Sequence, residues 1–307
     1  MRKPTLLLIA LLGNSMVWGQ AVPQMRTRLL TSLTNTEIEQ YLKRNDVIFI
    51  PVGTVENHAG LPIDCEYVGP LAYAVKLAEK ADGLVLPGLV YFFPDATVVG
   101  RGAVHVTPSD GTAYLKAIAY SLLRQGFRRQ IYITGHGPSF ETVAPLVREF
   151  YDETHVPIVY LESLRPRATG NTTAPPPSSQ PDPARSTQGN KRMFGAYEIV
   201  GRLDDIPLNL TEPMPVHPAD PGIDNLFPLG PSSGTIGFYM SDAIDHQGAA
   251  IPVTAEQRDQ MTKEGVAQIE DEVKNFDING ILQAMRDHDK FTQDEIASKY
   301  GWMFPTK

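Results

Sequence analysis

The stretch that decides the fold runs from residue 48 to residue 58 and reads IFIPVGTVENH. Its apolar, β-branched first half is typical of a buried strand, and the proline and glycine after it indicate a strand end that opens into a loop. That loop carries Glu56 and His58, and Asp64 and Glu66 follow a few residues later. Ligands of open α/β sheets gather outside the carboxyl ends of the strands. We therefore expect a site here in which carboxylate oxygens and imidazole nitrogens bind a divalent metal.

A second apolar strand ends in the same way. Residues 130–138 read QIYITGHGP, which places His136 at the tip of the loop after the strand. The carboxyl ends of parallel strands share one edge of the sheet, so His136 can lie opposite Glu56 and His58. A single Glu-x-His pair, or a single loop histidine, is typical of an ordinary exposed loop. The two strand ends together favour a metal site.

Strands and helices alternate along most of the chain. Helical periodicity and capping residues predict helices over 67–81, 112–125, 140–153 and 254–276, and apolar runs predict further strands at 84–86 and 158–161. The alternation predicts a single α/β domain over residues 22–307, with a mainly parallel sheet between two layers of helices. Residues 165–191 hold almost no apolar side chains, so we expect a disordered insertion there, either a linker or a lid.

The N-terminus predicts export. Arg2 and Lys3 precede an apolar run too short to span a bilayer, and small residues follow up to Ala21. This pattern is typical of a cleaved signal peptide, here residues 1–21, and predicts a periplasmic or secreted protein without a stable membrane anchor. The formal net charge of −8 disfavours a nucleic-acid partner, because phosphates are bound by Lys and Arg. Cys65 is the only cysteine, so no internal disulfide can form, and we expect it to be a small packing residue.

The sequences of the loops that carry Glu56 and His136 resemble those of the creatininase (creatinine amidohydrolase) family. Its members have a strand that runs into Pro-x-Gly-x-x-Glu-x-His-Gly-Pro-His-Leu-Pro-Leu-x-x-Asp, and a later Asn-Gly-His-Gly-Gly-Asn. This chain reads PVGTVENHAGLPIDCE at 51–66 and TGHGPS at 134–139, and so resembles a divergent, exported member. The resemblance implies a three-layer creatininase-like fold, a homo-oligomer, and a metal-dependent hydrolase. That enzyme would use metal-activated water to cleave a C–N bond in a small linear or cyclic amide.

The resemblance also assigns metal ligands residue by residue. Glu56, His58 and His136 fall on ligands of the family. The chain is one residue shorter after His58, and aligning Leu-Pro-Ile at 61–63 with the family's Leu-Pro-Leu puts Glu66 on the bridging Asp of the family. Asp64 is the alternative bridging carboxylate.

A fifth ligand is expected in the segment MFGAYEIV at 193–200, which resembles the family's His-Ala-Gly-x-x-Glu-Thr-Ser. Glu198 takes the place of the family's Glu. By this alignment Glu56 and His136 would hold one ion, His58 and Glu198 the other, and Glu66 would bridge them. The expected cofactor is one or two divalent ions, Zn²⁺ first, with Mn²⁺ and Fe²⁺ as alternatives.

Three differences from the family motifs argue against a typical creatininase-like enzyme. Met193 stands where the family has a histidine that resembles a proton-transfer group, the histidine of the family's Gly-Pro-His segment is absent, and Gly-Gly-Asn has become Gly-Pro-Ser at 137–139. A thioether cannot carry a proton, so His105 is the nearest candidate catalytic residue, ahead of His217 and His246. The departures favour an alternative function, that of a catalytically degraded exported protein that binds a metal or a ligand. A sugar-directed lyase or isomerase is a further alternative, because related folds host several chemistries.

Overall fold

The computed structural model describes residues 24–58, 61–99, 101–162, 183–208 and 254–303, together with the single residues 222, 237 and 239. These residues form a parallel sheet in the order β2-β1-β3-β4. The strands are β1 (Val47–Pro51), β2 (Leu84–Val85), β3 (Arg129–Ile133) and β4 (Val159–Leu161). The helices are α1 (Asn35–Leu42), α2 (Cys65–Ala81), α3 (Pro108–Gln125), α4 (Phe140–Thr154), α5 (Pro183–Ile199), α7 (Ala255–Asn275), α8 (Ile278–Phe291) and α9 (Ser298–Tyr300).

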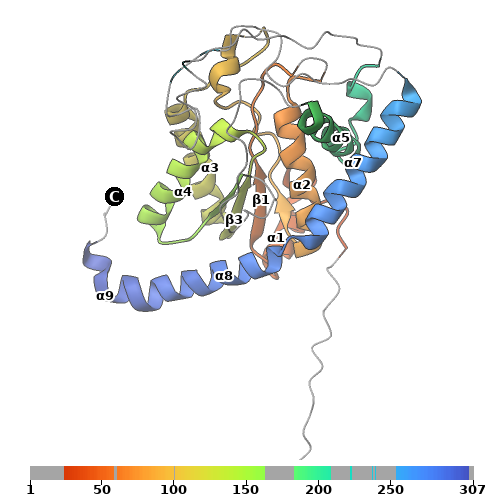
Figure 1. Ribbon diagram of the computed structural model, residues 1–307. Helices are drawn as coiled ribbons and strands as arrows, with labels where there is room; N and C mark the ends of the chain where they lie inside the picture. The colour runs from red at the N-terminus through yellow and green to blue at the C-terminus, as the bar shows by residue number, and fades with distance from the viewer. Residues whose placement is uncertain are drawn as a thin grey trace, which may run out of the picture.

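Helices cover both faces of the sheet (Figure 1). Successive side chains of a strand point to opposite faces, so β1 contributes Phe49 to one core and Ile48 and Ile50 to the other. The first core contains residues of α2, α5, α7 and α8, and the second contains residues of α1, α3 and α4. The expected three-layer α/β/α architecture with a parallel sheet is confirmed.

The central pair of strands positions the candidate site. β1 and β3 are neighbours, and their register pairs Pro51 with Ile133 at the carboxyl end of both strands. The loops that follow them therefore start side by side. Gly53 in the first loop lies so close to α2 that a Cβ atom there would fall 2.4 Å from the Cα atom of Tyr67, so only glycine permits this approach.

Helices α5 and α7 pack backbone against backbone. A Cβ atom on Gly195 would lie 2.3 Å from the carbonyl carbon of Gly265, and one on Gly265 would lie 1.8 Å from the carbonyl oxygen of Lys191. No side chain fits between the two helices at this crossing. Because α5 also packs on α2, α7 fixes which face of α5 turns toward the site.

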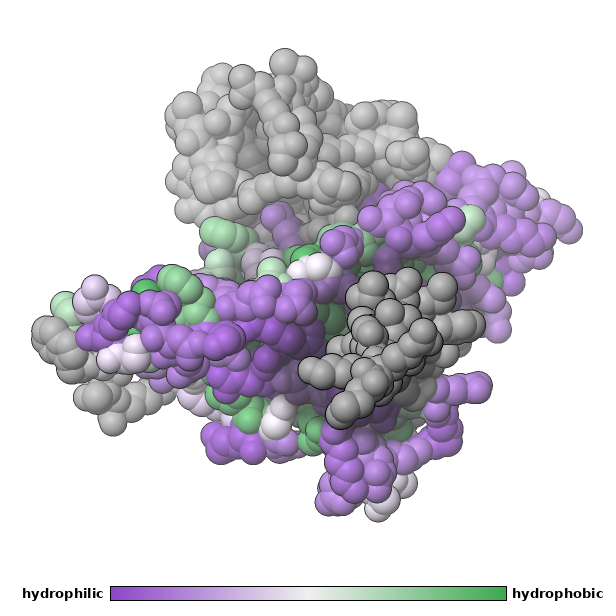
Figure 2. Space-filling model, turned by 90° about the horizontal axis from the view of Figure 1, so that it is seen from below, coloured by the Kyte–Doolittle hydropathy of each residue, from purple (hydrophilic) through white to green (hydrophobic). Residues whose placement is uncertain are grey.

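Helix α8 crosses the amino edge of the sheet, at the opposite end from the site loops (Figure 1). It is held there by Asp289, which accepts a hydrogen bond of 2.7 Å from Arg128, directly before β3. Figure 2 looks onto the molecule from this side and shows a mainly hydrophilic described surface with scattered apolar residues. Within the described ranges, no helix is long and apolar enough to cross a membrane.

Most of the expected elements are confirmed, with shifted ends. α3 begins at Pro108 instead of residue 112, because Thr107 is the N-cap and accepts a hydrogen bond from the backbone N–H of Asp110. α7 has the expected capping box of Thr254 and Gln257. The insertion expected at 165–191 ends too late, since α5 already begins at Pro183. Three other expectations lie outside the described residues. They are the part of the insertion before Pro183, the signal peptide at 1–21, and the histidines His217 and His246.

Two arginines converge on Asp82 at the end of α2. Arg28 lies 2.6 Å and Arg44 lies 2.9 Å from its carboxylate oxygens, and the side chain of Asp82 is 15% exposed. Burial would raise the pKa of Asp82, but the hydrogen bonds and charges of Arg44 and Arg28 outweigh it and hold the pKa below its usual value. The ionised carboxylate therefore stabilises the fold above its unfolded pKa of about 3.9, and this contribution is lost as the pH falls through the lower folded pKa.

We predict that Asp82→Asn lowers the free energy of unfolding at pH 7 by about 1–3 kcal/mol, because the negative charge that accepts three hydrogen bonds from Arg28 and Arg44 is lost. Asparagine tolerates the left-handed φ of 48° at this position, so the variant isolates the charge. Urea unfolding at several pH values should show the difference from wild type shrink below about pH 4. The exposed Asp259→Asn is the control. A deficit that stays constant from pH 7 to pH 3 would contradict the assigned role of the charge.

Candidate metal centre

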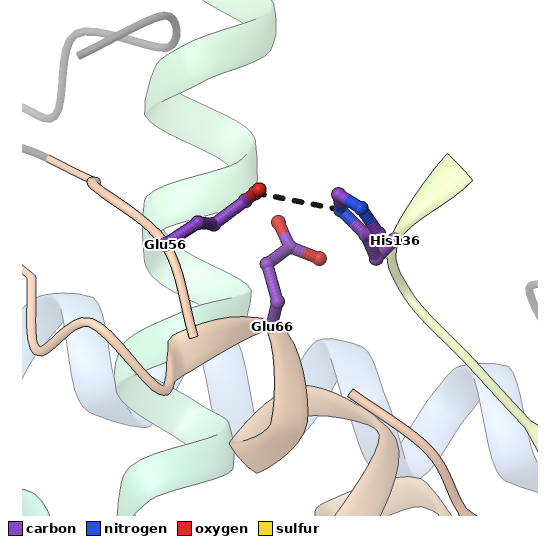
Figure 3. Close-up of side chains that lie close together, drawn as sticks. All are labelled: Glu56, Glu66 and His136. Atoms are coloured by element: carbon purple, nitrogen blue, oxygen red, sulfur yellow. Dashed lines mark ion pairs between the residues drawn. The ribbon is translucent and has the colours of Figure 1, made fainter. Parts of the chain in front are cut away.

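Three buried side chains from separate elements meet at the carboxyl edge of the sheet. Glu56 follows β1, Glu66 lies in the first turn of α2, and His136 follows β3 (Figure 3). One ligand atom from each lies within 4.8 Å of the others. Their exposures are 0%, 8% and 6%, so the carboxylates and the imidazole are almost completely removed from water. A divalent ion bound to this group would have oxygen and nitrogen ligands from three chain segments.

His58 belongs to the same cluster. Its Nε2 atom lies 3.0 Å from Oε1 of Glu56 and 3.3 Å from Oε1 of Glu66, and its side chain is 3% exposed. Oε1 of Glu56 also lies 3.4 Å from Nδ1 of His136. The structure thus brings together four of the five expected ligands.

Burial and neighbouring charges shift the pKa of each carboxyl and of the imidazole in this cluster. Burial would raise the pKa of Glu56, but the charge and hydrogen bonds of His136 and His58 hold it well below its usual value. Burial would lower the pKa of His136, and the charge and hydrogen bond of Glu56 raise it instead. For Glu66 burial prevails and raises the pKa of the carboxyl. The two glutamates therefore differ, since the imidazoles favour ionisation of Glu56 more strongly.

Asp64 does not point into the cluster. Its Oδ1 atom accepts a hydrogen bond of 2.9 Å from the hydroxyl of Tyr197, and its Oδ2 atom lies 2.6 Å from Nη1 of Arg202. Both oxygens are therefore engaged on the α5 side of the loop. Glu66, not Asp64, is the second carboxylate of the group, as the alignment of residues 61–63 predicts.

Glu198 is not brought to the cluster. Its side chain is exposed on α5, whereas the neighbouring Tyr197 is buried and faces the start of α2. Met193, one turn earlier, lies near Gly69. A Cβ atom built on Gly69 would be 3.8 Å from the Cε atom of Met193. The face of α5 that turns toward α2 is thus occupied by Met193 and Tyr197. In this structure, Glu198 is not positioned as the expected fifth ligand.

His105 lies near the cluster but not in it. Its side chain is exposed, and its ring packs on Phe93 with 5.6 Å between ring centroids. The loop is held by a hydrogen bond of 3.2 Å from the backbone N–H of Val104 to the carbonyl of Val55, directly before Glu56. His105 therefore lies beside the loop that carries Glu56.

Two further groups contact the cluster from outside, and the motifs gave no signal for either. The hydroxyl of Thr97 donates to Glu56, and the carbonyl of Phe93 lies within hydrogen-bond distance of His136.

Cys65, next to Glu66, is completely buried, and burial raises the pKa of its thiol to about 11. It is therefore a neutral thiol at physiological pH.

The comparisons with known proteins converge on one family. A family model for creatininase, described as creatinine amidohydrolase, matches residues 31–193, which is more than half of the chain. A 3-dehydro-scyllo-inosose hydrolase of Thermotoga maritima is 29% identical over 133 residues, 42% of this chain and 42% of that protein. A creatinine amidohydrolase of Pseudomonas putida is 32% identical over 111 residues, 34% of this chain and 43% of that protein. The chain therefore matches less than half the length of these relatives.

Solved structures show the same fold. A tryptophan-to-alanine mutant of creatininase aligns with a TM-score of 0.51 and 19% identity over 81% of this chain and 98% of that one. A proposed creatinine amidohydrolase from Bacteroides fragilis aligns with a TM-score of 0.52 and 16% identity over 82% of this chain and 98% of that one. At these identities the likeness concerns the fold.

The positions of the two acids lead to opposite expectations for two isosteric variants. Glu66→Gln should sharply lower the metal content of purified protein, because it removes a charged ligand from the cluster. Asp64→Asn should keep the metal content and lower the free energy of unfolding by about 1 kcal/mol, because Arg202 loses its partially exposed ion pair. Elemental analysis and thermal melts of both variants distinguish the two roles. The reverse ranking in metal content would make Asp64 the ligand.

Proposed function

Because this chain belongs to the creatininase family, we propose that it is a metal-dependent hydrolase that cleaves the C–N bond of a linear or cyclic amide. The observation that carries the proposal is the buried cluster of Glu56, His58, Glu66 and His136 at the ends of adjacent strands. In α/β folds, active sites usually lie outside the carboxyl ends of the parallel strands, where this cluster lies.

The cluster fits a divalent cation. Two buried carboxylates lie together, and no lysine or arginine of the described ranges forms an ion pair with either of them. Buried carboxylates without a permanent cationic partner are costly, and a divalent ion would offset that cost. The mixture of carboxylate oxygens and imidazole nitrogens suits Zn²⁺, and also Mn²⁺ and Fe²⁺.

In the proposed reaction, the metal ion and the protein side chains would have different roles. A divalent ion in such a site lowers the pKa of a water molecule and polarises a substrate carbonyl. Glu56 and His136 would hold it together with Glu66, and His58 extends the donor set toward a second ion. Met193 cannot transfer a proton, so the leaving nitrogen would take its proton from another group, for which His105 is the candidate.

A second substrate class follows from one of the relatives. The Thermotoga maritima protein is named a hydrolase of 3-dehydro-scyllo-inosose, and the Pseudomonas putida protein a hydrolase of creatinine. Hydrolysis is common to both names, whereas the substrates differ. A hydrolase of such an inosose is therefore the alternative that the similarity supports, beside the expected alternative of a sugar-directed lyase or isomerase.

The test is a substrate panel with metal-loaded protein. Protein reconstituted with Zn²⁺ or Mn²⁺ should hydrolyse at least one linear or cyclic amide, and chelation should abolish the activity. His58→Ala should lower both metal content and melting temperature, because an ion bound only to the native state stabilises it. Glu198→Gln is the matched control and should keep activity and metal.

Three outcomes would count against the proposed function. Protein that binds no divalent metal would refute the site. Protein with a full metal complement that hydrolyses only the inosose would favour the second substrate class. Protein that turns over neither class would favour a binding protein that keeps the fold without catalysis.

We further propose that the mature protein begins near Val22 and acts in the periplasm or outside the cell. The proposal rests on the basic start, the short apolar run and the small residues before that point. N-terminal sequencing of the protein recovered from the periplasm or the medium should begin close to Val22. Recovery of an intact Met1 from the cytoplasm would contradict export.

A further inference from the structure

The segment between β2 and α3 contacts two of the candidate ligands from behind. The hydroxyl of Thr97 lies 2.5 Å from Oε2 of Glu56, and the carbonyl oxygen of Phe93 lies 3.2 Å from Nε2 of His136. Both contacts come from a stretch of five residues, and they reach ligands that follow different strands. This segment therefore connects the β1 side of the cluster to the β3 side.

The Thr97 contact determines which oxygen of Glu56 faces the cluster. The Thr97 side chain is 8% exposed, and its hydroxyl lies near two acceptors, Glu56 and the carbonyl of Pro94 at 2.7 Å. The hydroxyl has a single proton, and an ionised carboxylate is the stronger acceptor. Donation to Oε2 leaves Oε1 directed at His58 and His136, at 3.0 and 3.4 Å. Thr97 thus fixes the rotation of the carboxylate.

The Phe93 contact determines the tautomer of His136. A carbonyl oxygen can only accept, so Nε2 of His136 must carry the proton of this hydrogen bond. In the neutral ring the lone pair then lies on Nδ1, which is the nitrogen that faces Glu56. A metal ligand needs that lone pair, and a backbone acceptor on the other ring nitrogen is the usual way to direct it.

The backbone of the segment is itself constrained. Asp95 has a φ of 55°, in the left-handed region that non-glycine residues seldom adopt. The turn at Asp95 lies between Phe93 and Thr97 and starts the 3₁₀ helix Asp95–Val99. The conformation places the carbonyl of Phe93 and the hydroxyl of Thr97 toward the same cluster.

From these contacts we infer that Thr97 is a positioning residue of the metal centre, and that with the Phe93 carbonyl it orients Glu56 and His136 for metal binding. The inference rests on the proposed metal site and adds residues that do not themselves touch the ion. Loss of such an outer hydrogen bond typically weakens metal affinity by about 10- to 100-fold.

The test compares two variants at position 97 with a matched control. Thr97→Val removes the hydroxyl and keeps the shape of the side chain, and Thr97→Ser keeps the hydroxyl. Thr262→Val is the control, because Thr262 is equally buried in α7 and its hydroxyl donates to the carbonyl of Arg258 at 2.8 Å, within the same helix. Competition of apo-protein with a chromogenic chelator for Zn²⁺ gives the dissociation constant, and thermal melts without metal give the structural cost.

We expect Thr97→Val to weaken Zn²⁺ binding about 10- to 100-fold, and Thr97→Ser and Thr262→Val to bind within about 3-fold of wild type. The melts of the two valine variants should agree closely. If Thr97→Val does not fold, Thr97→Ala replaces it with the same expectation.

Equal affinity of Thr97→Val and wild type would overturn the positioning role while leaving the metal site intact. Equal weakening of Thr97→Ser and Thr97→Val would also overturn it, because the hydroxyl would then not be the cause. Wild-type protein that does not bind Zn²⁺, Mn²⁺ or Fe²⁺ would refute the metal site itself, which is a distinguishable result.

Discussion

Two buried carboxylates side by side are the constraint on which the rest of the structure depends. Glu56 and Glu66 lie in a region that excludes water, and their described charged neighbours are the imidazoles of His58 and His136. Holding like charges together at such a depth is costly unless a cation is bound between them. The fold meets this requirement by bringing two loops and the first turn of α2 to one edge of the sheet, and by holding Glu56 and His136 from behind through Thr97 and the carbonyl of Phe93.

The sheet and the helices each supply part of that placement. The adjacent, in-register strands β1 and β3 start two of the loops side by side, and the close approach of α2 at Gly53 brings in the third. The Asp64 interactions with Tyr197 and Arg202 then tie the start of α2 to α5. Since α5 is held against α7 through Gly195 and Gly265, the backbone contact between these two helices helps to place Glu66.

Much of this could be predicted from the sequence, and the limits have physical causes. The apolar run before Glu56 and the loop at His136 predicted the strands and three of the four clustered side chains, and the alignment of residues 61–63 favoured Glu66, which lies in the cluster, over Asp64, which does not. Glu198, expected from the alignment of residues 193–200, is exposed, because an alignment does not tell which face of a helix packs inward, and the inward face of α5 holds Tyr197. Thr97 and Phe93 could not be found, because their role depends on a loop conformation that no motif specifies.

The departures from the family pattern concern the proton-transfer position at Met193 and the second carboxylate, which is Glu66 where the family has an Asp. Met193 packs beside Gly69, which lies about one turn after Glu66 on α2. The arrangement keeps the means to bind a metal and changes the means to move a proton. This combination is consistent with a family member whose substrate differs from that of its relatives.

The central claim, that these four side chains bind a metal, is tested most directly by anomalous diffraction from crystals of the protein loaded with Zn²⁺. The account predicts an anomalous peak between Glu56, Glu66 and His136, with His58 beside it. A peak coordinated by Asp64 or by Glu198 in place of Glu66, or the absence of any peak at this edge of the sheet in fully loaded crystals, would contradict it.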